Sequence, residues 1–484
     1  PAWAPLPDRR RGACVDCGEP VKYSDFVSTK LTRVPPVGFD ADVDSAYLFP
    51  FQRDLVRWAL ARGRCAIFAS TGLGKSRMQV TWADHVSRHV DRPVLVLAPL
   101  AVARQTVAEG ASIGVGVTLC RDQSDVRPGI NITNYDRVHL FDAASFGGVV
   151  LDESSIIKHH NAKTLQTLID AFGDTPFKLC CTATPSPNDY VELGTHAEFL
   201  GICSRVEMLA EYFVHDGGET QKWRLKGHAR SVFWKFVASW GALVRSPSDL
   251  GYDGSSYELP PITVEHHTIA ASVDTLRDAG LLFAAPASGL MERRQARRSS
   301  ISDRVARCAE LVNADSVPWV VWCDLNDESR MLCDAIHGSV EVTGSMSSDE
   351  KEAALARFAS GEARVIVSKP SICGFGLNWQ HCHSMAFVGV TDSWEAYHQA
   401  TKRIHRFGQT KPCAIHVFAS DVEGAVIANL ARKERDAVAM AEQLAAEAGE
   451  SVRESVLGSR RISNGYEAST RMIVPSWVRT ECAA

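Results

Sequence analysis

The chain has 484 residues, of which 45% are hydrophobic and 23% charged, and its formal net charge is -5. At roughly 150 residues per domain, this length favours two or three domains, and the composition is that of a globular protein rather than a disordered one. The negative charge excludes a protein that binds polyanions over its whole surface, so any nucleic-acid binding must come from a local basic surface.

The cysteines and the apolar runs indicate the compartment. The 14 cysteines are scattered singly through apolar segments, which is typical of a reducing compartment rather than a disulfide framework. The most apolar stretch, residues 94–103, is far shorter than the ~20 residues that span a bilayer. The amino terminus has no apolar segment of the signal-peptide kind. We therefore expect a cytoplasmic protein without membrane contacts.

Residues 1–45 are rich in Pro and Arg and predict an irregular extension. Cys14 and Cys17 within it have the spacing of a zinc knuckle. Tetrahedral zinc needs two more ligands, and no second C-x-x-C follows, so we do not expect zinc there. The HCH triplet at 381–383 is interpreted as packed histidine rather than a metal site.

From about residue 50 onward, short apolar runs alternate with longer helical patterns, which is typical of parallel α/β domains. Strands are expected at 65–69, 94–98, 129–133, 148–152 and 178–183, and six further runs follow an irregular, Trp-rich connecting segment. A long polar helix from 421 to about 448 is either a brace across a domain surface or a solvated terminal helix. The expected division is 46–200, 201–260, 261–420 and a C-terminal helix and tail at 421–484.

The stretch FASTGLGKSRMQ places two glycines, a lysine and a serine directly after an expected strand. Gly72 and Gly74 would let backbone N–H groups turn inward, while Lys75 would reach the β- and γ-phosphates of a nucleotide and Ser76 would hold Mg²⁺. Ala69 stands where the full phosphate-loop pattern has its first glycine. The stretch predicts a nucleotide-binding loop, with a Gly-rich turn as the alternative.

A second expected strand ends in paired carboxylates, Asp152 and Glu153, within GGVVLDESS. A carboxylate at a strand's carboxyl end can hold Mg²⁺, and its neighbour can polarise the attacking water. Acidic residues also often begin loops. Because the pair follows the glycine-rich loop by about 75 residues, we expect both at one site in a doubly wound sheet.

These motifs, in this order, resemble superfamily 2 helicases, and within them the Swi/Snf-like DNA translocating ATPases related to DEAD/DEAH-box proteins. The resemblance runs from about 49 to 409. ASTGLGKS resembles motif I, and DESSIIKHHNAK resembles the D-E-A-H-x-x-K-N box with Ser155 in place of the histidine and the lysine kept at Lys158. CGFGLNW resembles motif V and QATKRIHRFGQ motif VI. The resemblance implies two tandem RecA-like parallel-sheet domains with ATP and Mg²⁺ in the cleft between them.

The resemblance also implies individual roles. Gln52 would read adenine, and Thr71 and Gly376 would join the loop residues in binding the nucleotide. Arg403 and Arg406 would lie on one face of a helix and meet a phosphate across the cleft, whereas a solvated helix face is the alternative for this pair. Residues implied to couple nucleotide state to domain movement are Thr182, Thr184 and Gln399.

Two basic segments are candidate nucleic-acid contacts. In TQKWRLKGHARSVFWKFVASW, Trp223 is the candidate for contact, while Trp234 and Trp240 are expected to pack in a core. MERRQARRSSISDR would present paired arginines on one side of a helix, either against DNA or to solvent. The arginines proposed from this second segment are Arg293, Arg294 and Arg297.

The expected function is a nucleic-acid-stimulated ATPase that translocates on DNA, with duplex preferred, single strands as a second substrate, and unwinding or remodelling left open. The alternative is an ATP-controlled DNA-binding or recruitment module with little turnover. Only about 75 residues separate TATPSPNDYVEL, which resembles motif III, from the second domain. This short spacing favours a compact bacterial or bacteriophage motor, in the host cytoplasm if viral. No protein partner is indicated.

Overall fold

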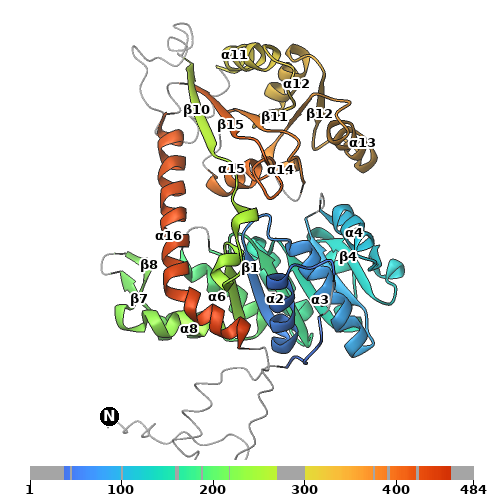
Figure 1. Cartoon of the computed structure of the whole chain (residues 1–484), viewed down its shortest axis with the longest axis vertical. Helices are drawn as coiled ribbons and strands as arrows, with labels where there is room; N and C mark the ends of the chain where they lie inside the picture. The colour runs from blue at the N-terminus through green and yellow to red at the C-terminus, as the bar shows by residue number, and fades with distance from the viewer. Residues whose placement is uncertain are drawn as a thin grey trace, which may run out of the picture.

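The computed structural model describes residues 37–43, 46–99, 102–158, 163–186, 189–216, 219–269, 300–373, 377–389, 393–420 and 424–458. They form two RecA-like α/β domains, each built on a parallel sheet, with one long helix running alongside both (Figure 1). The expected fold class is confirmed. Cys14, Cys17, Arg293, Arg294, Arg297 and Gly376 lie outside the described residues.

The first sheet has the strand order β3-β4-β2-β5-β6-β1-β9, and its neighbouring strands pair in parallel. Strands β2 and β5 are buried at every position, which explains why they read as continuous apolar runs. The strands are β1 (Arg64–Ala69), β2 (Val94–Ala98), β3 (Val117–Leu119), β4 (Ile130–Asn134), β5 (Gly148–Asp152), β6 (Phe177–Thr182) and β9 (Gly241–Val244).

Parallel pairing requires crossover connections, and helices supply most of them. The loops after β1 and β5 both open at the carboxyl edge of the sheet, where α/β proteins bind ligands. The helices of this domain are α2 (Pro50–Arg62), α3 (Lys75–Val90), α4 (Ala103–Ser112), α5 (Lys163–Phe172), α6 (Leu193–Leu200), α7 (Arg205–Tyr212) and α8 (Arg230–Trp240).

The segment 201–260 is more regular than the sequence predicted. It contains α7, α8, the antiparallel pair β7 (Phe213–Asp216) and β8 (Glu219–Leu225), and β9. Trp234 and Trp240 of α8 are buried in the first domain's core, as expected. Burial of this helix face places β9 beside β1, so the first sheet extends well past residue 200.

The second sheet has the order β10-β15-β14-β11-β13-β12 and is parallel throughout. Separate apolar cores lie on its two faces. Its strands are β10 (Ile262–Ile269), β11 (Trp319–Cys323), β12 (Ser339–Val342), β13 (Val365–Ser368), β14 (Ser384–Val388) and β15 (Cys413–Ser420). Its helices are α11 (Ile301–Asn313), α12 (Asn326–Ala335), α13 (Ser348–Ala359), α14 (Pro370–Cys373) and α15 (Trp394–Thr401).

Helix α16 (Gly424–Leu457) joins the two domains along one side of the molecule (Figure 1). Val426 near its start is part of the second domain's core, whereas Val452 and Val456 near its end are part of the first domain's core. Trp58 of α2 also donates a hydrogen bond from Nε1 to Ser455 Oγ (3.0 Å). The brace predicted from the sequence is confirmed. Neither this helix nor any other described one combines the length and apolarity needed to cross a membrane.

Because Val452 is 2% exposed, we predict that Val452→Asp lowers the unfolding free energy of the first domain by about 3–5 kcal/mol, the cost of an unpaired buried charge. Urea denaturation followed by tryptophan fluorescence measures this. Arg453→Asp introduces an aspartate at the next position, on the exposed side of the helix. It should change the unfolding free energy by less than about 0.5 kcal/mol. Equal losses in the two variants would contradict the packing described for α16.

Candidate active site

The loop between β1 and α3 carries two glycines in left-handed conformations, Gly72 (φ 91°) and Gly74 (φ 79°). A Cβ on Gly74 would lie 2.2 Å from Gln52 Nε2, and one on Gly72 would lie 3.0 Å from the backbone nitrogen of Phe407, a residue of the second domain. Both positions therefore favour glycine through their positive φ, and at Gly72 the close approach of backbone atoms is a second reason. The loop leads into the amino terminus of a helix, where anions bind.

Lys75, the first residue of α3, points back along the loop. Its Nζ donates to the carbonyl oxygens of Ala69 (2.7 Å) and Ser70 (3.2 Å). Burial lowers the pKa of Lys75, while the neighbouring carboxylates of Glu153 and Asp152 raise it. The ammonium thus lies at the phosphate loop, hydrogen-bonded to neutral carbonyl groups.

Asp152 is the last residue of β5 and lies beside the phosphate loop. Its Oδ1 accepts hydrogen bonds from Gln79 Nε2 (2.8 Å) and from the backbone N–H of Glu153 (3.1 Å). Burial raises the pKa of Asp152 to about 6, against the opposing effect of the Gln79 hydrogen bond. The carboxyl group therefore titrates close to neutral pH.

Glu153 adopts a left-handed backbone conformation (φ 54°) that is uncommon for a residue with a side chain. Its Oε1 accepts hydrogen bonds from Thr182 Oγ1 (2.6 Å) and Ser155 Oγ (3.0 Å). Thr182 Oγ1 in turn accepts a hydrogen bond from the backbone N–H of Thr184 (3.1 Å). Two hydroxyl groups, from Thr182 and Ser155, thus fix the carboxylate in place.

The two arginines reach the same region from the second domain. Arg403 is 3% exposed and donates to Gln399 O (2.8 Å), Leu377 O (3.0 Å) and Gln399 Oε1 (3.3 Å). Arg406 also donates to Leu377 O (3.1 Å). Burial, and then the neighbouring Arg406, lower the pKa of Arg403 to about 9. Both groups remain cationic at neutral pH.

The expectation that both arginines lie on a helix is wrong. Helix α15 ends at Thr401, and Arg403 and Arg406 follow it in a turn. The carbonyl of Arg403 accepts a hydrogen bond from Trp379 N (3.0 Å), which ties this turn to the loop before β14. Their convergence comes from a shared carbonyl partner, Leu377, rather than from helical spacing.

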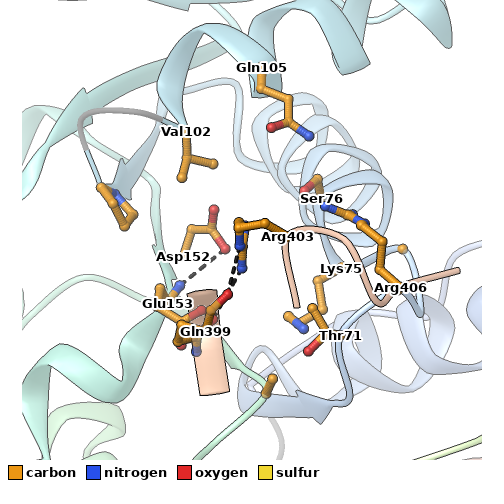
Figure 2. A pocket seen from close by; sticks show the side chains of 14 residues that line it. Thr71, Lys75, Ser76, Val102, Gln105, Asp152, Glu153, Gln399, Arg403 and Arg406 are labelled. Carbon is orange, nitrogen blue, oxygen red and sulfur yellow. Dashed lines mark hydrogen bonds between the residues drawn. The ribbon is translucent and has the colours of Figure 1, made fainter. Parts of the chain in front are cut away.

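These groups line one pocket between the domains (Figure 2). Gln105 and Val102, from the segment after β2, also line it and were not among the expected site residues. The expected site residues that the structure brings together there are Thr71, Gly72, Gly74, Lys75, Ser76, Asp152, Glu153, Gln399, Arg403 and Arg406.

Three other expected residues have different positions. Gln52 lies behind the loop, 2% exposed, with its Nε2 donating to Leu73 O (2.8 Å) and its Oε1 accepting from Phe49 N (2.9 Å). Thr182 and Thr184 reach the pocket only through Glu153. Trp223 lies on β8, away from the pocket, with its ring 3.8 Å from that of His215 between centroids.

Further contacts join the domains around the pocket. Lys158 of the acidic motif forms an ion pair with Glu395 of α15, and Arg104 of α4 forms one with Glu352 of α13. The ring of Phe407 packs on Tyr257, 4.6 Å between centroids. No pattern along the sequence pairs residues so far apart, so these contacts could not be predicted.

The residues in the pocket fit a Mg²⁺–nucleotide. The Ser76 hydroxyl and Asp152 carboxylate are oxygen donors of the kind that Mg²⁺ prefers. Lys75, Arg403 and Arg406 are three cations that donate to neutral carbonyl groups in the described part of the chain, so their charge is available to an anionic ligand. This arrangement can bind a polyphosphate and stabilise added negative charge.

Comparison with known proteins adds one family match. Residues 305–408 match the helicase conserved C-terminal domain. No curated protein sequence matches the chain. Among solved structures, the chain is similar to the Sulfolobus solfataricus SWI2/SNF2 ATPase core in complex with dsDNA, with 16% identity over 78% of this chain and 88% of that one. Its TM-score is 0.39, a value at which the similarity carries no weight for function.

Since Asp152 has a pKa of about 6, and only its ionised form can hold Mg²⁺, we predict that Mg²⁺-dependent nucleotide affinity rises with pH between about 5 and 7. Fluorescence titration of a labelled ADP with and without Mg²⁺ measures it. Nucleotide binding to Asp152→Asn still depends on pH, because the nucleotide's own phosphate has a pKa of about 6. The difference between the wild-type and variant curves isolates Asp152, and identical curves would contradict the assignment.

Proposed function

We propose that the chain is a nucleic-acid-stimulated ATPase that translocates on DNA, with duplex DNA as the preferred track. One observation carries the proposal: the phosphate loop, the acidic pair and the arginines of the second domain line a single pocket. A site divided in this way is complete only when the two domains meet. ATP hydrolysis can therefore be coupled to their relative movement.

The first domain binds the nucleotide. The backbone N–H groups around Gly72 and Gly74 and the Lys75 ammonium hold the β- and γ-phosphates, exchanging their present partners for phosphate oxygens. Ser76 and Asp152 would hold Mg²⁺, which when bound neutralises charge on the phosphates. The hydrogen bond from Gln79 orients the Asp152 carboxylate for this role.

Glu153 positions the water that attacks the γ-phosphate. Ser155 and Thr182 both donate to its Oε1, which leaves Oε2 to accept a hydrogen bond from that water. Because Thr182 also accepts from the backbone of Thr184, movement of the segment after β6 changes the orientation of the base. This linkage supports the coupling role proposed for the two threonines.

Arg403 and Arg406 stabilise charge on the transferring phosphoryl group from across the cleft. Release of phosphate removes the anion that attracts them to the first domain, so the domains separate. If each domain grips the DNA backbone, alternating grips move the protein along it. Gln399, which bonds Arg403 through both its backbone and side-chain oxygens, transmits this change to α15.

DNA as the substrate rests on the sequence motifs and on the helicase C-terminal match at 305–408. Trp223 and the arginines at 293, 294 and 297 remain the proposed contacts, with phosphates meeting the arginines and a base meeting the indole. The compact bacterial or bacteriophage type, a cytoplasmic location and Gly376 as a nucleotide contact are part of the same proposal.

The substrate is tested by measuring phosphate release with no nucleic acid, duplex DNA, single-stranded DNA and RNA. We predict the largest stimulation with duplex DNA, because that is the track proposed. Triplex displacement then tests translocation, and Glu153→Gln should abolish both activities. DNA binding with turnover no faster than Glu153→Gln would instead identify an ATP-controlled binding module.

The two domains contribute different charged groups to the site, which gives a second prediction. Arg406→Ala should lower kcat by about 10³-fold, as for other arginines that act in trans, with a much smaller loss of ATP affinity. Lys75→Ala should lower both kcat and ATP affinity, since it removes the phosphate-facing ammonium of the first domain.

Arg330→Ala removes an exposed arginine of the same domain and should leave both quantities unchanged. Near-normal DNA-stimulated turnover in Arg406→Ala would show that this arginine does not act on the nucleotide.

A further inference from the structure

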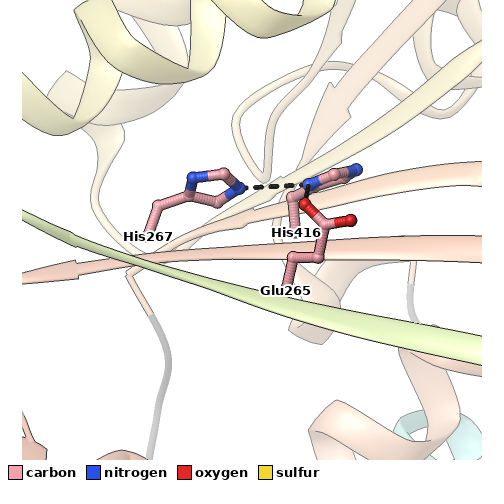
Figure 3. Close-up of side chains that lie close together, drawn as sticks. All are labelled: Glu265, His267 and His416. Carbon is pink, nitrogen blue, oxygen red and sulfur yellow. Dashed lines mark hydrogen bonds and ion pairs between the residues drawn. The ribbon is translucent and has the colours of Figure 1, made fainter.

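A cluster of two histidines and a glutamate lies on the second sheet, formed by strands β10 and β15 (Figure 3). Glu265 and His267 are two residues apart on β10, so their side chains point to the same face. His416 of β15 is the register partner of Glu265 in the parallel pair. The sheet thus brings together three potential metal ligands that are distant in sequence.

The distances within the cluster suit a small cation. His267 Nε2 lies 3.1 Å from His416 Nδ1, which lies 3.4 Å from Glu265 Oε2. All three atoms are within 4.8 Å of one another. A tetrahedral ion with bonds of about 2.0–2.1 Å separates its ligand atoms by about 3.3 Å. Two of the three spacings are already close to that value.

One nitrogen atom of the cluster faces both of the other two groups. His416 Nδ1 faces both His267 Nε2 and Glu265 Oε2, yet a ring nitrogen carries either one hydrogen or one lone pair. With a hydrogen, it must divide one donor between two acceptors. With a lone pair, it faces the carboxylate oxygen without a proton between them. A cation in the centre would use all three lone pairs together.

Aromatic rings pack against both histidine side chains. The His267 ring stacks on Phe418, 4.4 Å between centroids, and the ring of Trp319 lies 5.5 Å from that of His416. These aromatic contacts restrict rotation of the ligands.

We propose that Glu265, His267 and His416 form a binding site for a divalent transition-metal ion such as Zn²⁺, separate from the nucleotide pocket. Two histidines and one carboxylate are a common ligand set for zinc with an open fourth position. The Glu265 side chain is 62% exposed, so water can complete the coordination. Because β10 is the edge strand that follows the connecting segment, a bound ion would fasten it to β15.

The test uses the full chain stripped with a chelator, in a Cys14→Ser, Cys17→Ser background that removes the other candidate thiol ligands. Zn²⁺ is titrated against a chromophoric indicator, and Co²⁺ binding is followed by visible absorption. We expect one saturable ion with the spectrum of tetrahedral Co²⁺ and no thiolate charge-transfer band. Affinity should fall below about pH 6, as protons compete for the histidines.

Matched variants locate the site. His267→Gln and Glu265→Gln should each weaken binding by more than about 100-fold, since losing a ligand costs more than the 10–100-fold loss caused by removing a partner of a ligand. His266→Gln, one residue along the same strand and on its other face, should bind normally. Circular dichroism checks that each variant is folded. No saturable binding in the parent, or undiminished binding in His267→Gln, would overturn the proposal.

Discussion

The close approach of Phe407 to Gly72 is the contact on which the proposed mechanism depends. At this point the second domain touches the phosphate loop of the first, and a Cβ on Gly72 would lie 3.0 Å from both the backbone nitrogen and the Cβ of Phe407. Arg406 is the preceding residue, so the same contact places its guanidinium at the mouth of the loop (Figure 2). A side chain at position 72 would have to displace Phe407 by a few tenths of an ångström, and it would adopt a positive φ that is strained for residues other than glycine.

The remaining interdomain contacts determine how the two domains can move relative to each other. The ion pair between Arg104 and Glu352 lies at the cleft with about half of each side chain exposed, and this solvent exposure weakens it. Helix α16, in contrast, is packed into both apolar cores. The contacts between the domains are therefore weak near the nucleotide pocket and strong along α16. This difference favours opening of the domains about α16 rather than their full separation. Such a hinge suits a motor whose two halves must stay together through each cycle.

The sequence predicted the parts of the fold that depend on local pattern. The runs that form β2, β5 and β11 were recognised because a strand buried in a parallel sheet is apolar over its whole length. The phosphate loop was recognised because glycine, lysine and serine have separate physical roles there. The long helix α16 followed from its spacing of apolar residues, although it ends at Leu457 rather than near 448.

Features that depend on contacts between distant segments could not be predicted. Strand β9 is only four residues long and was assigned to a connecting segment. Arg403 and Arg406 were placed on a helix, because nothing in their own segment shows that the helix ends at Thr401 and that Trp379 bonds the turn after it. The Glu265–His267–His416 cluster exists only through the register of β10 on β15, strands that are 149 residues apart at His267 and His416.

In the proposed mechanism, both domains contact the γ-phosphate of one nucleotide. Photo-crosslinking with an ATP analogue that carries an aryl azide on its γ-phosphate tests it most directly, with labelled peptides identified by mass spectrometry. We predict ATP-competable labelling of two peptides, one spanning 69–79 and the other spanning 399–409. Labelling confined to the first domain would contradict it.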